Sequence, residues 1–482
     1  LLKRMCSTLR HRGPDDMGLF IDEDHHVGLG HTRLSIIDLE GGHQPLSNED
    51  GSIWITYNGE IYNYRELRDN LLAKGHSFRT SSDTEVIVHL YEDHGKDCLR
   101  FLNGMFAFAI WDRINHHLFL ARDRLGVKPL IYAETGNGFF FASEHKALIQ
   151  AINNPTVDYQ TISDYLTFSF IPAPATVYSD IRKLPPGCMM TVSSSDVTIE
   201  KYWGVISGGY DANHGCEDDY ILNLLESSVT SRMVSDVPVG SYLSGGVDST
   251  CIATFMRNHV RDADINTFSL VYDESLAGKD EDRRYAHLMS RRLHTKHHEY
   301  ILSPKEFWDD LPAIAQCFDE PHSGVVSSFF LTKLVKNHVK VALAGDGGDE
   351  LFAGYSMNQF PRYFSWYSRL PAFIRQTLIP YTANAMERMS PFFGPLRLPS
   401  RFLHFASGDE ADWRLNFLIF TDKEKNALLG EALRSPSILP ARRLMESWFS
   451  ECTESNDPVT RSLEVEINHI LPDGELYFVD RL

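Results

Sequence analysis

The stretch Ser244-Gly245-Gly246-Val247-Asp248-Ser249 decides the fold of the second half of the chain. It follows a segment at 240–243 that we expect to be a strand and precedes a run at 249–259 that is typical of a helix. The two glycines let the backbone curl so that several N–H groups point to one place, and the helix N-terminus adds partial positive charge. This order predicts a phosphate-binding loop. A glycine-rich turn with an acidic helix cap is the plainer alternative.

The same order of elements recurs around this loop. We expect helices at 218–233, 249–259 and 285–293, and strands at 240–243, 267–271 and 339–343. Strands alternating with helices predict a doubly wound parallel sheet, which binds its ligand at the carboxyl ends of the strands. The sequence of residues 356–460 predicts mostly helix and contains no motif that indicates a function.

A second glycine-rich loop follows the strand at 339–343, and this loop is acidic. It reads Ala344-Gly345-Asp346-Gly347-Gly348-Asp349-Glu350. Carboxylates this close repel one another unless a cation or a proton relieves them, and a divalent cation would also explain an aspartate in the phosphate loop. Taken alone, the segment is equally well explained as a solvated acidic turn.

Together the two loops resemble the signatures of the ATP pyrophosphatases, and of the asparagine synthetases among them. The resemblance implies that Asp248 and Asp349 bind Mg²⁺ and that Asp346 acts in forming an aspartyl-adenylate. It also implies an ATP site that comprises Leu243, Ser244, Gly245, Gly246, Asp248, Ser249, Leu270, Ala344, Gly345 and Arg481. The family frequently has Ser where this chain has Ala344, a departure that we expect binding to tolerate.

The first 150 residues have a different pattern, with short alternating runs separated by Gly, Asn and Asp turns. Strands are expected at 53–57, 106–111, 118–121 and 139–142, and helices at 64–74 and 84–94. Neighbouring strands that pair locally, with few helices between them, predict antiparallel sheets. The fold class is therefore α+β in the first half and α/β in the second.

Four short motifs in this half occur in the order that is typical of glutaminase domains of N-terminal-nucleophile amidotransferases. They begin at Arg10, His31, Tyr57 and Ser82. The resemblance implies an αββα sandwich that binds glutamine. In it, Arg33 would hold the α-carboxylate of glutamine, and Glu60 and Asp83 would hold its α-ammonium. Asn58 and Gly59 would form the oxyanion hole, although Asn-Gly is by itself an ordinary hairpin turn.

The nucleophile of that family is a cysteine at the mature N-terminus, and this chain begins with Leu1. Cys6 lies in a helix-like segment, and we interpret it as a buried structural thiol. We therefore expect both ends of the chain to be truncated and the chain as given to use ammonia only.

Bulk composition excludes several classes of function. Lys and Arg number 46 against 65 Asp and Glu, which gives a net charge of −19 and argues against nucleic-acid or anionic-membrane binding. Seven scattered cysteines indicate reduced thiols, and the absence of a long apolar run or a signal peptide favours a cytoplasmic enzyme. The histidines at 25–26, 116–117, 294 and 297–298 show no partners at ligand spacing, so we expect no metal site there.

We predict a glutamine amidotransferase domain at 1–155, a connecting segment at 156–215 and an asparagine synthetase domain at 216–482. The implied reaction converts aspartate, ATP and glutamine-derived ammonia to asparagine, AMP and pyrophosphate, and relatives suggest a homodimer. One alternative is a specialised amide or β-lactam synthetase that acts on another carboxylate. Another is a non-catalytic protein that keeps the fold.

Overall fold

The computed structural model describes residues 1–205, 217–260, 264–273, 280–323 and 326–355. Beyond these it describes residues 358, 367, 369–371, 373–389, 410–415, 419–430, 437–452 and 457–482. Cys216 and part of the predicted helical region between 356 and 460 lie outside the described residues. The described part of that region is helical, with a π-helix at η5 (Ile374–Leu378), followed by α13 (Ile379–Met389), α15 (Glu410–Leu415), α16 (Asp422–Leu428) and α17 (Arg442–Glu451).

The first half is built on a six-stranded antiparallel sheet in the order β11-β10-β6-β5-β4-β3. Its strands are β3 (Leu46–Ser47), β4 (Ile53–Ile61), β5 (Gly104–Asp112), β6 (His117–Arg122), β10 (Cys188–Val192) and β11 (Val197–Lys201). Two smaller antiparallel sheets comprise β1 (Asp16–Asp22) with β2 (Val27–Arg33), and β7 (Ile131–Thr135) with β8 (Gly138–Ala142) and β9 (Arg182–Lys183). The expected strands are all present, and the antiparallel prediction is confirmed.

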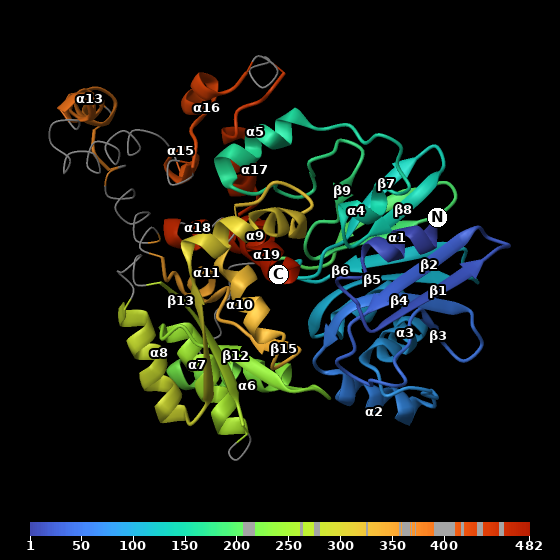
Figure 1. Ribbon diagram of the computed structural model, residues 1–482. Helices are drawn as coiled ribbons and strands as arrows, with labels where there is room; N and C mark the ends of the chain where they lie inside the picture. The colour runs from blue at the N-terminus through green and yellow to red at the C-terminus, as the bar shows by residue number, and fades with distance from the viewer. Residues whose placement is uncertain are drawn as a thin grey trace.

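Alternation along β5 shows how this half forms four layers. Phe106, Phe108 and Ile110 pack under helices α2 (Tyr64–Lys74) and α3 (Asp83–His94). The residues between them, Ala107, Ala109 and Trp111, pack against β2 and β7. Helices α1 (Leu2–Thr8) and α4 (His145–Leu148) pack on the outer side of these smaller sheets through a third hydrophobic cluster. Helix, sheet, sheet and helix therefore stack as the predicted αββα sandwich (Figure 1).

The second half is built on a four-stranded sheet in which every pair is parallel, in the order β14-β13-β12-β15. Its strands are β12 (Val239–Tyr242), β13 (Asn266–Tyr272), β14 (Lys296–Leu302) and β15 (Val341–Leu343). The helices that connect or flank them are α6 (Glu217–Arg232), α7 (Val247–His259), α8 (Asp280–Leu293), α9 (Pro304–Cys317), α10 (Ser327–Val335) and α11 (Gly348–Phe352).

Helices cover both faces of this sheet. On β13, Phe268 packs against Val335 of α10. The flanking residues of β13, Thr267 and Ser269, point to the opposite face and contact His297, whose ring meets His287 of α8. Because helices lie on both sides, the doubly wound prediction is confirmed.

The two halves are interlocked. Helix α5 (Tyr159–Phe168) leaves the first half and packs through Phe168 against Trp448 of α17. The last elements are α18 (Pro458–Val465), π-helix η8 (Glu466–Glu475) and α19 (Leu476–Arg481), and α19 ends beside the first half (Figure 1). There the Asp480 carboxylate pairs with the Arg12 guanidinium at 2.6 Å. The segment predicted as a connector contains β10 and β11, which join the first sheet, so we propose that the domain boundary falls after Lys201.

Among the described residues, no helix is both long enough and apolar enough to cross a membrane.

Candidate functional site

The glycine loop after β12 has the conformation that the sequence predicts. Gly245 has a φ of +87°, and a Cβ there would come within 2.7 Å of the backbone of α8, so only glycine fits. The Ser244 hydroxyl accepts from the Gly246 N–H at 3.3 Å and lies 3.0 Å from the hydroxyl of Ser249. Helix α7 begins directly after this turn. An exposed N–H-rich turn therefore stands at the start of a thirteen-residue helix, as a phosphate site requires.

The acidic loop after β15 meets this turn. A Cβ on Gly345 would lie 2.9 Å from the Cβ of Asp248, and a Cβ on Gly348 would lie 3.0 Å from its Cγ. Burial, and then the charge of Asp349, raises the pKa of Asp248. The two predicted magnesium ligands thus lie close enough to repel each other, and a divalent ion bound between them would relieve that repulsion.

The remaining predicted nucleotide contacts lie along the same edge of the sheet. Leu243 follows β12 and donates its N–H to Phe268 of β13, the strand that carries Leu270. Ala344 follows β15, the other neighbour of β12. The carboxyl ends of three adjacent strands therefore converge on the glycine turn.

Tyr355 and Glu475 stand beside the carboxylates of the acidic loop, and sequence reasoning missed both. Desolvation and the charge of Glu350 raise the pKa of Asp346, although Asp346 as a whole residue is exposed. The hydroxyl of Tyr355 donates to Glu350 at 2.7 Å. Burial, then Glu350 and Asp346, raises the pKa of Glu475 to about 7. Glu475 lies far along the chain on η8, so no local pattern could have associated it with Asp346.

The predicted glutamine-binding residues gather in the first half. They line a cavity of about 590 Å³, namely Arg33, Asn58, Gly59, Glu60 and Asp83. Gln44 and Tyr57 also line it, and sequence reasoning missed both; the amide oxygen of Gln44 accepts the Tyr57 N–H at 2.7 Å.

Asn58 and Gly59 fit the role of oxyanion donors. The Asn58 side-chain N–H₂ is buried and has no hydrogen-bond partner among the described residues. A buried donor without an acceptor is costly, and an incoming oxyanion would satisfy it. At Gly59, a Cβ would come within 2.1 Å of the Met105 carbonyl, so the close approach of β4 to β5 requires glycine.

Glu60 and Asp83 form a coupled acidic pair. Burial, and then the charge of Asp83, raises the pKa of Glu60 to about 9. Asp83 is buried and accepts from the Tyr57 hydroxyl at 2.8 Å and from the Ile61 N–H at 2.9 Å. Two buried carboxyl groups this close favour a cation between them, and an α-ammonium supplies one.

Arg33 is held in place by the loop that follows it. Its Nη2 donates to the carbonyls of Ile37 at 2.9 Å and Asp38 at 2.7 Å, which fix the guanidinium beside the cavity. Cys6 lines the cavity from α1, is 4% exposed and has a pKa raised by burial. A buried thiol of raised pKa is a poor nucleophile, in agreement with the structural role predicted for it.

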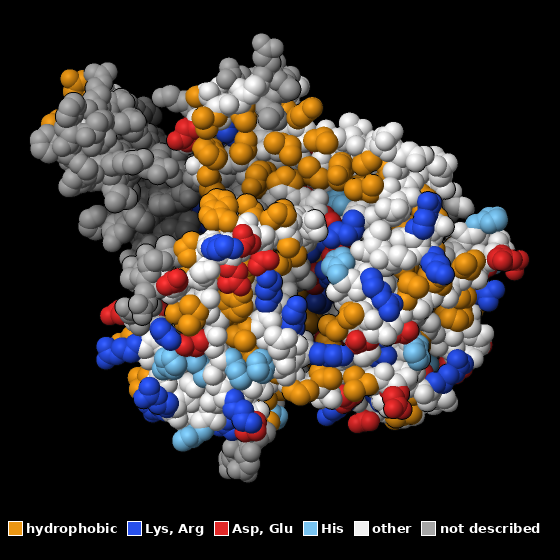
Figure 2. Space-filling view, in the orientation of Figure 1, with side chains coloured by type: hydrophobic (Ala, Val, Ile, Leu, Met, Phe, Trp, Pro, Cys, Tyr) orange, Lys and Arg blue, Asp and Glu red, His pale blue; other side chains and the backbone are white. Residues whose placement is uncertain are grey.

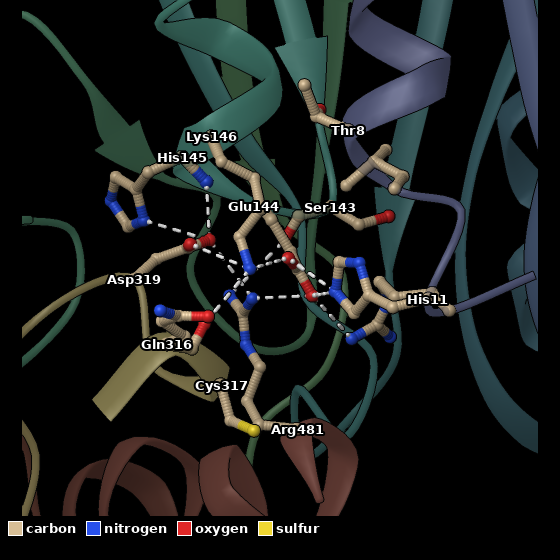
Figure 3. A network of polar contacts seen from close by, with 12 residues as sticks. Thr8, His11, Ser143, Glu144, His145, Lys146, Gln316, Cys317, Asp319 and Arg481 are labelled. Atoms are coloured by element: carbon tan, nitrogen blue, oxygen red, sulfur yellow. Dashed lines mark hydrogen bonds and ion pairs between the residues drawn. The ribbon is translucent and has the colours of Figure 1, made fainter. Parts of the chain in front are cut away.

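Arg481 lies between the halves, and its contacts differ from those predicted. Its Nη1 pairs with Glu144 at 2.8 Å and Asp319 at 3.1 Å (Figure 3). The guanidinium also lies 4.9 Å from the centre of the Tyr477 ring. Glu144 and Asp319 neutralise the Arg481 guanidinium, and neither residue belongs to the glycine turn. Contact between Arg481 and ATP therefore stays a prediction. Figure 2 shows the surface hollowed between the halves, with basic and acidic side chains in the hollow.

Two histidine clusters emerge only in the tertiary structure. His297 has no partners at ligand spacing in the sequence, but the fold brings ligand atoms of His287 and Glu299 within 4.8 Å of its own, and the absence of a metal site there stays a prediction. In the first half, the ligand atoms of Glu49, His76 and His89 also lie within 4.8 Å of one another. Each cluster joins residues of at least two elements, His287 of α8 with His297 and Glu299 of β14 in one case, so spacing in sequence does not reveal the whole cluster.

Comparison with known proteins agrees with this geometry. The glutamine amidotransferase domain family matches residues 1–203, and the asparagine synthase family matches residues 221–482, more than half of the chain. Asparagine synthetase [glutamine-hydrolyzing] 1 of Bacillus subtilis is 38% identical over 395 residues, which cover 81% of this chain and 61% of that protein. Asparagine synthetase [glutamine-hydrolyzing] 3 of the same organism is 36% identical, over 73% of this chain and 60% of that protein.

The chain thus spans about three fifths of the length of these relatives. A solved glutamine phosphoribosylpyrophosphate amidotransferase from B. subtilis covers 62% of this chain at 18% identity, with a TM-score of 0.32, a likeness too weak to carry an argument. The two matched families, in this order along one chain, decide the matter: the protein belongs to the asparagine synthase family, with a glutamine amidotransferase domain preceding the synthase domain.

Proposed function

We propose that the protein makes asparagine from aspartate, with ATP as the activating substrate and glutamine as the nitrogen donor. The observation that carries the proposal is the meeting of the two loops, in which Gly345 and Gly348 of the acidic loop pack on Asp248 of the glycine turn. Family membership supports the same reaction. The resemblance also implies a cytoplasmic homodimer, which stays a prediction.

In the second half, the turn at 244–249 would hold the β and γ phosphates through backbone N–H groups and the hydroxyls of Ser244 and Ser249. Asp248 and Asp349 fit a divalent cation, and Mg²⁺ bound there would neutralise phosphate charge. The aspartate β-carboxylate then attacks the α-phosphate, which gives aspartyl-AMP and pyrophosphate. Adenylation is necessary because a free carboxylate has no adequate leaving group.

In the first half, Arg33 would bind the α-carboxylate of glutamine, and Glu60 with Asp83 its α-ammonium. Asn58 and Gly59 would donate to the oxyanion that forms when the N-terminal cysteine typical of the family attacks the amide and ammonia leaves, an interaction worth about 3 kcal/mol per donor in such sites. Ammonia released there would attack the acyl carbon of the adenylate. Enclosure between the halves protects both species from water.

The test is adenylate formation, followed as exchange of labelled pyrophosphate into ATP with one candidate acid at a time. We expect exchange with aspartate and asparagine formation when ammonium is added. Exchange with a different acid, and none with aspartate, would replace aspartate by that acid and point to a specialised amide or lactam synthetase. Failure to bind MgATP in calorimetry would point instead to a non-catalytic protein.

A further inference from the structure

On the outer face of the first half, four side chains converge outside the glutamine cavity. They are Glu49 from the loop after β3, His76 from the loop after α2, and His89 and Glu92 from α3. None of the four lines the cavity of the glutamine site. The side chain of His89 is fully buried, whereas that of Glu49 is 41% exposed, so the cluster is closed below and open to solvent above.

We propose that Glu49, His76, His89 and Glu92 form a binding site for a divalent transition metal of the Zn²⁺ type. Two imidazoles and two carboxylates are a ligand set that Zn²⁺ accepts in tetrahedral geometry. The inference concerns a site separate from the proposed reaction and does not depend on it.

The distances between the candidate ligand atoms fit such an ion. Glu92 Oε2 lies 2.7 Å from His89 Nδ1 and 3.6 Å from His76 Nδ1, and Glu49 Oε2 lies 3.8 Å from His89 Nδ1. The edge of a tetrahedron around Zn²⁺, with bonds near 2.05 Å, is about 3.3 Å. These three separations differ from that edge by roughly half an ångström, and the ligand atoms of Glu49, His76 and His89 all lie within 4.8 Å of one another.

The surroundings orient these ligands as those of established metal sites do. The other carboxylate oxygen of Glu49 accepts the Ser77 N–H at 3.0 Å, and that of Glu92 accepts from Asn48 at 2.7 Å. On the far side of His89, Nε2 is buried without a hydrogen-bond partner among the described residues and lies 3.8 Å from Glu85 Oε1. A histidine that binds metal through one nitrogen commonly donates the other N–H to a carboxylate, and Glu85 stands in that place.

The second histidine cluster, His287 with His297 and Glu299, is a matched comparison that lacks these features. Both ring nitrogens of His297 already have partners, Thr267 at 3.0 Å and Ser269 at 3.1 Å. Glu299 is bound by the guanidinium of Arg283 at 2.8 Å, a cation that opposes a metal ion. We therefore expect metal in the first cluster and not in the second.

The experiment is calorimetric titration of the chelator-treated full chain with Zn²⁺, repeated with Co²⁺ while the visible spectrum is recorded. We expect one tight equivalent and an intense tetrahedral Co²⁺ spectrum without thiolate bands. His76→Ala should weaken Zn²⁺ binding at least tenfold. Glu92→Gln, which tests the site without removing the buried His89, should also weaken it. His287→Ala is the control and should bind like the native chain.

Three outcomes would overturn the proposal. The first is that the native chain binds Zn²⁺ no more tightly than the His76→Ala chain does. The second is a Co²⁺ spectrum typical of six oxygen ligands, and the third is a loss of Zn²⁺ affinity in His287→Ala equal to that in His76→Ala. Circular dichroism and MgATP titration on each variant establish that the chain is folded, so a fold defect is distinguished from a lost ligand.

Discussion

At the scale of single residues, the molecule concentrates uncompensated charge where it would receive ligands. Glu60 and Asp83 face each other in the glutamine cavity, and Asp248 and Asp349 do so in the loops of the second half. Burial, and then the charge of the partner carboxylate, raises the pKa of Glu60 and of Asp248, so ionising these groups costs free energy in the folded protein. A bound cation offsets both the burial and the repulsion of the carboxylates. The repulsion therefore favours binding of an ammonium group or a metal ion.

Glu60→Gln should weaken glutamine binding by about 10- to 100-fold, because a hydrogen bond to a charged group contributes roughly 1.5–3 kcal/mol. Calorimetric titration with glutamine measures the loss. The control is the analogue that lacks the α-amine, which the native and variant chains should bind equally weakly. Equal loss with this analogue would place Glu60 elsewhere than beside the α-ammonium.

Gly345→Ala should weaken MgATP binding by about tenfold or more, since a Cβ there meets Asp248 at 2.9 Å and the Ser249 N–H nitrogen at 3.2 Å. Overpacking of this kind costs about 1–3 kcal/mol. Gly136→Ala is the matched control because its Cβ meets nothing within 4 Å. Unchanged MgATP affinity in Gly345→Ala would contradict the proposed contact between the loops.

At the scale of elements, helix ends and strand alternation place the site residues. Asp83 reaches Tyr57 because α3 begins there, with the Ser82 hydroxyl accepting the Thr84 N–H at 3.1 Å as its cap. Alternation along β4 buries Tyr57 on the helix side of the sheet, next to Asn58, which lines the cavity. The geometry of the cavity therefore depends on where one helix begins and on which way one strand faces.

Ser82→Ala should destabilise the first half by about 1 kcal/mol, the usual value of a lost N-cap. It should also weaken glutamine binding, because Asp83 is the first residue of the capped helix. Urea denaturation followed by far-UV circular dichroism measures the first effect, and calorimetry the second. Ser303→Ala, which removes the cap of α9 in the other half, should lower stability without affecting glutamine. A loss of glutamine affinity in both variants would argue against a local effect.

At the scale of the whole molecule, buried ion pairs join the two halves. The carboxylate of Asp480, on α19, accepts hydrogen bonds from Arg12 Nη2 at 2.6 Å and from Lys128 Nζ at 2.9 Å. Both basic residues belong to the first half. Glu144, from the first half, pairs with Arg481 from the second (Figure 3). Such pairs add little over an apolar contact, but losing one partner leaves a buried charge unpaired. The halves are therefore held in one fixed arrangement by charge complementarity.

Asp480→Asn should destabilise the contact between the halves by about 3 kcal/mol at neutral pH. Burial would raise the pKa of Asp480, but Arg12 and Lys128 outweigh it and lower that pKa from 3.8 to about 2. A carboxyl whose folded pKa is depressed stabilises the protein above its unfolded pKa and loses this contribution as pH falls through the folded one.

The difference in stability between the native chain and Asp480→Asn should thus be constant from pH 7 to about 5 and shrink below pH 4. Urea midpoints measured across this range test the expectation. A difference that stays constant down to pH 3 would mean that the lost contribution is packing and not charge.

Much of this protein follows from local sequence. The glycine turn at 244–249, the strands that alternate in the first half and the parallel units of the second predict both folds, because periodicity and turn chemistry act over a few residues. The loops that carry Asp248 and Asp349 meet in the structure because they follow the adjacent strands β12 and β15. Resemblance to a family, and not spacing alone, supplied their roles.

Only the tertiary structure brings together groups that are distant in sequence. Glu475 beside Asp346, Arg481 between Glu144 and Asp319, and Glu49 beside His76 and His89 all depend on how separate elements pack. Local sequence specifies the path of the backbone within an element through steric and hydrogen-bond preferences. The electrostatic environment of a side chain is the sum over all elements that surround it, so it exists only once the chain has folded.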